Sequence, residues 1–273
     1  MIHQTARWRM EAKLKNKTAL VTGGTSGIGR QIAVCLAEEG VDVAIVSRRA
    51  DPQTVQEILS HGVAALGIEA DVSREADIAR MVGQTIARFG KVDLYVNNAA
   101  TAEHQPVTKI TAAAWRKTVD TNLAACLWAC REVSKHMIRR GQGSILVVGS
   151  TSIYTPGPRE AVYRMTKCGL KSLTQSLAIE LAPFAIRVNL LVPGHYRTRL
   201  TAGLSPEIEK RLIGEIPLRR FGQLRDCGNA AVMLLSDELS GYITGAELVV
   251  DGGLSLRPLN FMSDEELRRI NWE

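Results

Sequence analysis

The chain is poor in cysteine, and its cysteines follow no pairing pattern. They number five, no two of them form a C-x-x-C motif, and no histidines accompany them at zinc-finger spacing. Disulfide frameworks and structural zinc sites depend on such spacings, so the sequence argues against both, and no metal is expected. Cys126 and Cys130, four residues apart in an expected helix, are interpreted as small buried thiols rather than a redox pair.

Long hydrophobic runs are missing as well. No segment approaches the roughly 18 apolar residues that a membrane-spanning helix needs. Residues 1–13 carry Arg7, Arg9, Glu11 and Lys13 but no apolar block that resembles a secretion signal. We therefore expect a cytoplasmic protein without a membrane partner.

Internal repeats, low-complexity segments and Pro/Gly/Ser-rich linkers are also absent, which predicts one domain with short tails. The hydrophobic content of 45% and the charged content of 23% are ordinary for a globular protein. The formal charge of +6 could suggest nucleic acid, which rewards clustered lysines and arginines. The basic residues here are scattered as short pairs, so we expect no nucleic-acid partner; an anionic cofactor would use part of the charge.

Short apolar runs alternate with longer amphipathic stretches along most of the chain. The runs predict strands at residues 19–21, 43–46, 64–68, 92–96, 144–148, 187–192 and 247–250. The stretches between them predict helices, among them residues 29–39, 75–89, 115–139, 163–181 and 226–236. Such alternation is typical of βαβ units. The sequence thus predicts an α/β fold: one Rossmann-type, doubly wound domain with a seven-stranded parallel sheet flanked by helices.

This domain is expected to span residues 14–253, between an N-terminal extension, 1–13, and a C-terminal extension, 254–273. Residues 263–266, Ser-Asp-Glu-Glu, have the pattern of a capping box, and apolar residues follow one helical turn apart. A short final helix is therefore expected. Its role stays open between a surface helix without chemical importance and a flap or subunit contact.

A glycine-rich turn, residues 22–29, follows the first expected strand and opens the first helix. Glycines permit a tight turn and let backbone N–H groups approach a pyrophosphate at the helix N-terminus. The spacing G-x-x-x-G-x-G is not the commonest dinucleotide fingerprint, so the turn alone is not specific. The residues expected to hold a cofactor here are Gly23, Thr25, Ser26, Gly27, Ile28 and Gly29.

The second expected strand ends at Ser47, Arg48 and Arg49, where a dinucleotide fold would place the adenine ribose. An acidic residue there binds a free 2′-hydroxyl, whereas an arginine complements a 2′-phosphate. The sequence therefore favours NADP(H) over NAD(H). The alternative is that both arginines are loop charges directed at water.

Tyr163 and Lys167 lie four residues apart, on one face of an expected helix. A neighbouring cation favours phenolate and lowers the pKa of a tyrosine. Such a tyrosine can exchange a proton with an alcohol or ketone while a cofactor carries the hydride. A Y-x-x-x-K pair also arises by chance on solvated helices, so the pair needs support from other motifs.

Further motifs supply that support. Asp71 and Val72 follow the third expected strand, Asn97 and Asn98 the fourth, and Pro193 and Gly194 the sixth, with Thr198 four residues beyond Gly194. Asn122 lies in the long helix, and Ser150 stands thirteen residues before Tyr163. In this order and spacing, residues 14–253 resemble the short-chain dehydrogenases/reductases (SDRs).

The resemblance implies a catalytic set of four residues. Tyr163 would be the general acid/base, and Ser150 would hydrogen-bond the substrate oxygen. Lys167 would lower the pKa of Tyr163 and hold the nicotinamide ribose, and Asn122 would support a water that links Lys167 to solvent. Further cofactor contacts are implied for Asp71, Val72, Asn98, Tyr163, Lys167, Pro193, Gly194, Tyr196 and Thr198. A homotetramer or homodimer is also implied.

The loops beyond the carboxyl ends of the strands are polar, and ligands bind there in open α/β sheets. Their pocket candidates are Glu103, His104, Ser152, Tyr154, Arg159, His195, Tyr196, Arg197 and the segment 198–213. Of these, Ser152, Tyr154, His195 and Arg197 are the predicted substrate contacts. Tyr154 is expected to be a pocket wall, and Tyr196, where the resemblance suggests an aliphatic residue, would bring a hydroxyl near the substrate.

These loops predict a small polar carbonyl or alcohol substrate, such as a sugar, a polyol or an oxo acid. An enzyme like 3-oxoacyl-[acyl-carrier-protein] reductase is the alternative within the resemblance, because such reductases share every motif named above. A non-catalytic NADP-binding sensor or partner protein on the same fold is the alternative of another class.

Overall fold

A seven-stranded sheet forms the centre of the computed structural model, which describes residues 11–198, 201, 203 and 205–256. The strand order is β3-β2-β1-β4-β5-β6-β7, and every neighbouring pair is parallel. Each expected strand overlaps an observed one, which confirms the predicted Rossmann-type fold. The strands are β1 (Thr18–Thr22), β2 (Asp42–Ser47), β3 (Ala65–Glu69), β4 (Leu94–Asn97), β5 (Gly143–Val148), β6 (Ile186–Pro193) and β7 (Glu247–Val250).

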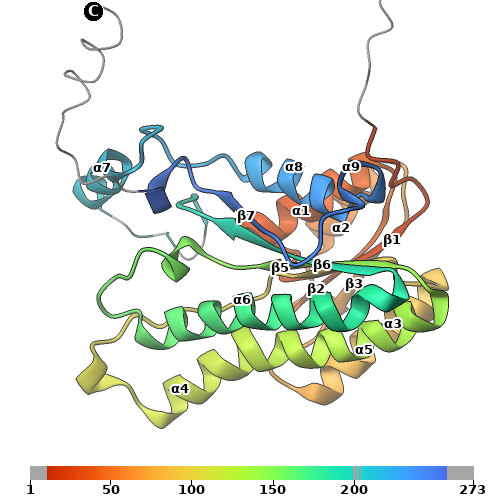
Figure 1. Cartoon of the computed structure of the whole chain (residues 1–273), viewed down its shortest axis with the longest axis horizontal. Helices are drawn as coiled ribbons and strands as arrows, with labels where there is room; N and C mark the ends of the chain where they lie inside the picture. The colour runs from red at the N-terminus through yellow and green to blue at the C-terminus, as the bar shows by residue number, and fades with distance from the viewer. Residues whose placement is uncertain (1–10, 199–200, 202, 204, 257–273) are drawn as a thin grey trace, which may run out of the picture.

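Helices cover both faces of this sheet (Figure 1). One layer consists of α1 (Gly27–Glu38), α2 (Pro52–Leu59), α8 (Leu224–Leu235) and α9 (Asp237–Ser240). The other consists of α3 (Glu75–Phe89), α4 (Ala112–Val119), α5 (Ala125–Arg140) and α6 (Ala161–Leu181). A further helix, α7 (Pro206–Glu215), lies beyond the carboxyl end of β6.

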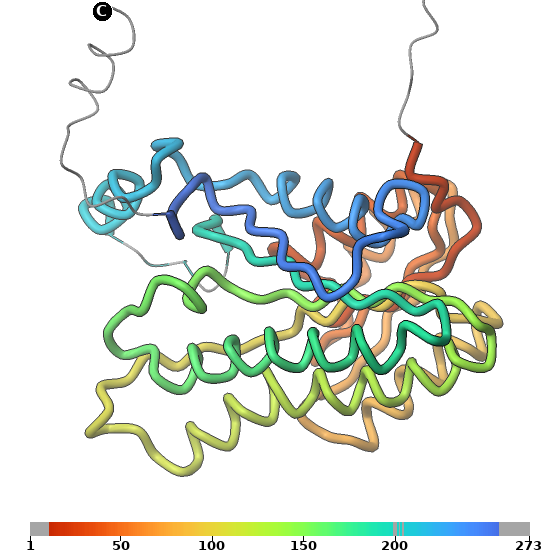
Figure 2. Tube along the Cα trace, viewed as in Figure 1, coloured from red at the N-terminus to blue at the C-terminus, as the bar shows by residue number. Residues whose placement is uncertain are grey.

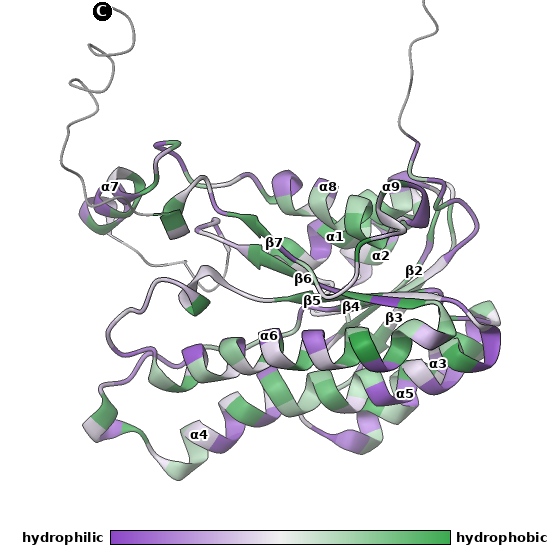
Figure 3. Cartoon of the chain, viewed as in Figure 1, coloured by the Kyte–Doolittle hydropathy of each residue, from purple (hydrophilic) through white to green (hydrophobic). Residues whose placement is uncertain are grey.

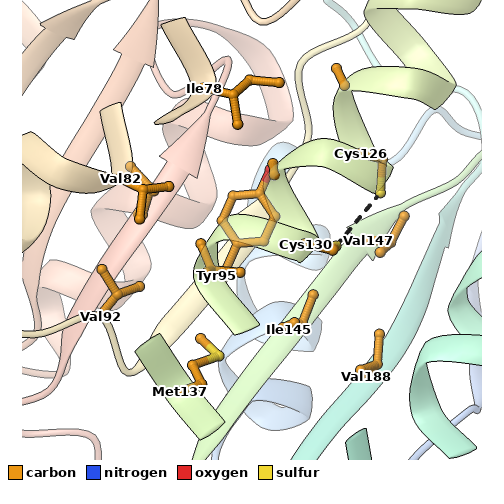
Figure 4. Packing of buried hydrophobic residues seen from close by; sticks show 14 of the residues in the cluster. Ile78, Val82, Val92, Tyr95, Cys126, Cys130, Met137, Ile145, Val147 and Val188 are labelled. Atoms are coloured by element: carbon orange, nitrogen blue, oxygen red, sulfur yellow. Dashed lines mark hydrogen bonds between the residues drawn. The ribbon is translucent and has the colours of Figure 1, made fainter. Parts of the chain in front are cut away.

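The helices present apolar faces to the sheet and polar faces outward (Figure 3). On α3, Ile78, Met81 and Val82 recur at helical spacing and are all buried. They pack with Tyr95 of β4 and Met137 of α5 in the larger of two core clusters (Figure 4). Burying a side chain of this size contributes about 1.5–3 kcal/mol, so packing, rather than helix propensity, holds the layers to the sheet.

The long helix expected at residues 115–139 is interrupted. A π-helical segment, Asp120–Ala124, joins α4 to α5. A π-segment inserts a residue into the helix and shifts the side chains that follow. The buried positions on either side of the π-segment recur at helical spacing, so their periodicity predicts one uninterrupted helix. The prediction was wrong about the π-segment.

The five cysteines are free, and Cys126 and Cys130 are buried with their Sγ atoms 4.0 Å apart (Figure 4). This confirms their interpretation as buried thiols. Among the described residues, no helix is long and apolar enough to cross a membrane. The final helix expected after Ser263 lies outside the described residues, and the boundaries at 14 and 253 stay predictions.

Candidate active site

The predicted site residues gather at the carboxyl edge of the sheet. The strand order changes direction between β1 and β4, and doubly wound sheets bind ligands in the crevice at such a switch point. The glycine loop follows β1, Asn98 follows β4, Ser150 follows β5 and Gly194 follows β6. The fold therefore brings together motifs that are far apart in the sequence.

Close packing explains the glycines of the loop. Gly23 and Gly27 have positive φ values of 65° and 55°, which glycine adopts without steric cost. A Cβ at Gly29 would lie 2.2 Å from Nδ2 of Asn98 and 2.4 Å from the carbonyl oxygen of Gly23. Asn98 Nδ2 itself donates to the carbonyl oxygens of Thr22 (3.0 Å) and Gly23 (3.2 Å). Asn98 thus fastens the glycine loop to β4.

The segment after β6 faces this loop. A Cβ at Gly27 would lie 3.3 Å from Cγ2 of Thr198, and a Cβ at Gly194 would lie 2.7 Å from the Cα of Asp251. The backbone N–H of Thr198 donates to Oγ1 of Thr201 at 2.8 Å. Thr198 therefore stands beside the helix N-terminus that would hold a pyrophosphate.

Arg48 and Arg49 are exposed at the carboxyl end of β2. Within the described part of the chain, neither guanidinium forms an ion pair with a side chain. The pKa of Asp71 is lowered, chiefly by a hydrogen bond from the hydroxyl of Ser73 (2.7 Å); burial opposes this, and the charges of Arg74 and Arg48 add to it. Arg48 therefore lies near Asp71, and both stand where an adenosine would bind.

Ser150, Tyr163 and Lys167 meet between β5 and the first two turns of α6. The hydroxyl of Ser150 accepts from the backbone N–H of Ser152 at 3.2 Å and also hydrogen-bonds with Tyr163. Nζ of Lys167 lies 5.7 Å from the ring centroid of Tyr163 and donates to the carbonyl oxygen of Val148 at 2.9 Å. The structure thus assembles the three side chains that the sequence singled out.

Three contributions set the pKa of Tyr163. Burial raises it, the hydrogen bond with Ser150 opposes the rise, and the charge of Glu160 adds to it. Burial also lowers the pKa of Lys167 to about 8. Of the three contributions to the Tyr163 pKa, the hydrogen bond with Ser150 is the one that favours the phenolate form. The lowering of the Tyr163 pKa by the Lys167 cation stays a prediction.

Asn122 occupies the π-segment and is almost fully buried. Its Oδ1 accepts from the N–H of Thr101, and its Nδ2 donates to the carbonyl oxygen of Thr101, both at 2.8 Å. Nδ2 also lies 3.2 Å from Oγ1 of Thr166, the neighbour of Lys167. Asn122 therefore connects the loop after β4 to α6 beside Lys167.

Known proteins are similar to this chain over most of its length. The family model described as enoyl-(acyl carrier protein) reductase matches residues 23–255. The chain belongs to the short-chain dehydrogenase/reductase family. It is 36% identical over 242 residues to 3-oxoacyl-[acyl-carrier-protein] reductase FabG of Staphylococcus epidermidis, covering 88% of this chain and 99% of that protein.

Two further SDRs are similar over most of their length. Dehydrogenase/reductase SDR family member 4 of Homo sapiens is 36% identical over 249 residues, covering 89% of each protein. The crystal structure of a short-chain type dehydrogenase/reductase from Mycobacterium marinum has a TM-score of 0.85 at 31% identity, covering 89% of this chain and 97% of that chain. The chain is therefore an SDR oxidoreductase.

Three of the pocket candidates form side-chain contacts within the chain. Tyr154 donates to Glu247 of β7. The ring of Tyr196 is buried and its hydroxyl donates to the carbonyl oxygen of Val250 at 2.8 Å. The expectation that Tyr196 brings its hydroxyl to the substrate was therefore wrong, because the ring turns into the core between β7 and α8. Arg197 is exposed and pairs with Glu209 of α7.

Two predicted substrate contacts, Ser152 and His195, are partly or fully buried. The hydroxyl oxygen of Ser152 is buried and has no hydrogen-bond partner among the described residues. His195 lies 5.9 Å from Phe221, ring to ring, and burial lowers its pKa. It lines a cavity of about 600 Å³ with residues of β7 and of the loop before α8. Both residues stay predicted substrate contacts.

A residue that the sequence did not single out lies beside Tyr163. Glu160, at the N-cap of α6, has its Oε1 3.9 Å from Nδ1 of His104. The ring of His104 is in turn 6.4 Å from that of Tyr163. The position of Glu160, three residues before Tyr163, was the signal in the sequence that could have found it, because three residues are about one helical turn.

Proposed function

We propose that this SDR is an NADP(H)-dependent oxidoreductase that interconverts a carbonyl and a secondary alcohol, with Tyr163 as general acid/base. The contact of Ser150 with Tyr163, next to Lys167, carries the proposal. These side chains lie at the switch point, beside a glycine loop shaped for a pyrophosphate. A proton donor and a second hydrogen-bond partner thus serve one substrate oxygen.

The residues around the crevice fit a dinucleotide. Gly23, Thr25, Ser26, Gly27, Ile28 and Gly29 would hold the pyrophosphate, while Ser47, Arg48, Arg49, Asp71 and Val72 would hold the adenosine part. Lys167 would bind the nicotinamide ribose, and Pro193, Gly194, Tyr196 and Thr198 would line the nicotinamide with their backbone or short side chains. The nicotinamide, when bound, supplies or accepts the hydride.

Tyr163 and Ser150 would carry out the proton transfer. In carbonyl reduction, Tyr163 Oη donates a proton to the oxygen that becomes the alcohol, and the hydroxyl of Ser150 hydrogen-bonds the same oxygen. The raised pKa of Tyr163 keeps its proton in place before the reaction. In alcohol oxidation the proton moves in the opposite direction, from the alcohol oxygen to Tyr163 Oη.

A small polar carbonyl is the substrate that we expect, because His104 and Glu160 lie beside Tyr163, and Arg159 bonds the backbone of His104. A 3-oxoacyl thioester is the second candidate, since the FabG relatives named above are 3-oxoacyl-[acyl-carrier-protein] reductases. The small-molecule partner and the cytoplasmic location stay predictions.

The test is NADPH oxidation with a panel of hydroxy ketones, oxo acids and 3-oxoacyl thioesters, with NADH in parallel. We expect Tyr163→Phe to lower turnover by about 10²- to 10⁴-fold, the usual contribution of a general acid, and to retain NADPH binding measured by fluorescence. Tyr242→Phe, at a fully exposed tyrosine, is the matched control.

An active Tyr163→Phe variant would contradict the assignment of the acid. A wild-type protein that binds NADPH but reduces no member of the panel would point to the sensor alternative instead.

A further inference from the structure

His104 is placed to contact the substrate. It belongs to the loop after β4, and its imidazole lies 6.4 Å from the Tyr163 ring, with the two rings tilted by 56°. Its side chain is 46% exposed, so it faces both the catalytic tyrosine and the solvent side of the site. A small group bound between the two rings would contact both side chains.

The neighbouring loop holds His104 in place. Arg159 donates from its guanidinium to the carbonyl oxygen of His104 at 3.0 Å. The N–H of Gln105 donates to the carbonyl oxygen of Arg159, also at 3.0 Å. Arg159 has a φ of 68°, a left-handed conformation that costs free energy in a residue other than glycine. The loop after β4 and the loop before α6 are therefore hydrogen-bonded to each other. Their traces run side by side in Figure 2.

Glu160 is the carboxylate next to the imidazole of His104. Its Oε1 lies 3.9 Å from Nδ1 of His104, and among the described residues the ring of His104 has side-chain contacts with Glu160 and Tyr163. With Nδ1 directed at the carboxylate, Nε2 on the other side of the ring is the nitrogen left for a ligand. The pair can thus offer a hydrogen-bond donor, with a carboxylate close by as acceptor.

We propose that His104, oriented by Glu160, recognises a hydroxyl group on the carbon next to the reacting carbonyl, so that the enzyme selects α-hydroxy ketones and the corresponding vicinal diols. The inference rests on the function proposed above. A hydroxyl both donates and accepts hydrogen bonds, as this pair requires. A carboxylate at the same position would meet the negative charge of Glu160, which disfavours oxo acids.

Hydroxyacetone, acetone and pyruvate test this, because they differ only in the substituent beside the carbonyl. With the full-length protein and NADPH, wild type should show a kcat/KM for hydroxyacetone at least about tenfold above that for acetone, the size of one hydrogen bond. His104→Phe should reduce this ratio by about tenfold, and His104→Gln, which keeps an N–H donor, should restore part of it.

Glu160→Gln should lower the preference for hydroxyacetone and raise turnover of pyruvate relative to acetone. His61→Phe, at an exposed histidine after α2, is the matched control and should change no ratio. Thermal melting and NADPH binding of each variant should match wild type, which separates recognition from folding.

A wild-type enzyme without preference for hydroxyacetone, or a His104→Phe variant that lowers kcat/KM equally for hydroxyacetone and acetone, would overturn the role of His104. The proposed function would stand in both cases. Failure of the wild type to turn over any carbonyl compound, 3-oxoacyl thioesters included, would overturn the proposed function as well.

Discussion

Tyr163 and Lys167 share a helix face, but burial sets how each of them titrates. The Lys167 ammonium is desolvated and donates to the carbonyl oxygen of Val148, so burial lowers its pKa to about 8. The phenol of Tyr163 is also buried, and its pKa rises. The spacing of the two residues predicted their proximity correctly. Their environment, built from β5 and α5, decided the direction of both shifts.

Arg48 allows a test of cofactor choice at the same scale. It is exposed at the end of β2 and lies near Asp71. We expect Arg48→Ser to raise the KM for NADPH by about tenfold to a hundredfold, because a hydrogen bond to a charged group contributes about 1.5–3 kcal/mol. The KM for NADH should change less than threefold, as measured by steady-state kinetics with both cofactors.

Arg88→Ser, at the far end of α3, is the control for a general loss of positive charge. Equal changes for NADPH and NADH in Arg48→Ser would show that Arg48 does not read the 2′-phosphate.

At the level of elements, alternation of apolar and amphipathic segments predicted every strand that positions the site. It missed the π-segment that carries Asn122, because the bonds from Asn122 to Thr101 and Thr166 span 21 and 44 residues. Hydrophobic periodicity is a local signal and holds no information about such contacts. The helices that carry Asn122, Tyr163 and Lys167 were therefore predicted at the right place in the sequence, but the π-segment was not.

The turn between β1 and α1 permits a test at the element scale. We expect Gly29→Ala to destabilise the protein by about 1–3 kcal/mol, the usual cost of overpacking, because its Cβ would clash with Asn98 and Gly23. NADPH affinity should fall as well, since the loop must shift. Urea unfolding and NADPH titration measure the two effects.

Gly83→Ala is the matched control, since Gly83 also lies in a helix but has nothing within 4 Å of the added Cβ. It should stabilise the protein by about 0.5–1 kcal/mol. A Gly29→Ala variant as stable as Gly83→Ala would contradict the close packing of the loop.

At the scale of the whole molecule, the helical layer of α4, α5 and α6 exposes large apolar side chains. Trp115, Leu127, Met165 and Ile179 have relative exposures of 40%, 39%, 54% and 79%. Apolar side chains gathered on one face of a soluble protein mark an interaction surface, and most oligomers are symmetric assemblies of one chain. We therefore expect a homotetramer, or a homodimer, with this layer at an interface.

Light scattering should give a mass of two or four chains. The Ile179→Glu variant should have a smaller mass, because a buried unpaired charge opposes association. Val107→Glu, at an exposed loop residue with a relative exposure of 76%, should leave the mass unchanged. A monomeric wild-type protein would contradict the expectation.

The order and spacing of short motifs determined the fold class, the family and the trio of Ser150, Tyr163 and Lys167, because each motif is read over a few neighbouring residues. Only the tertiary structure decided that Tyr196 turns into the core and that Glu160 and His104 flank Tyr163. These features depend on burial and on contacts between loops some 50 residues apart, such as Arg159 with His104, 55 positions away. Such contacts exist only once the sheet has brought its carboxyl ends together.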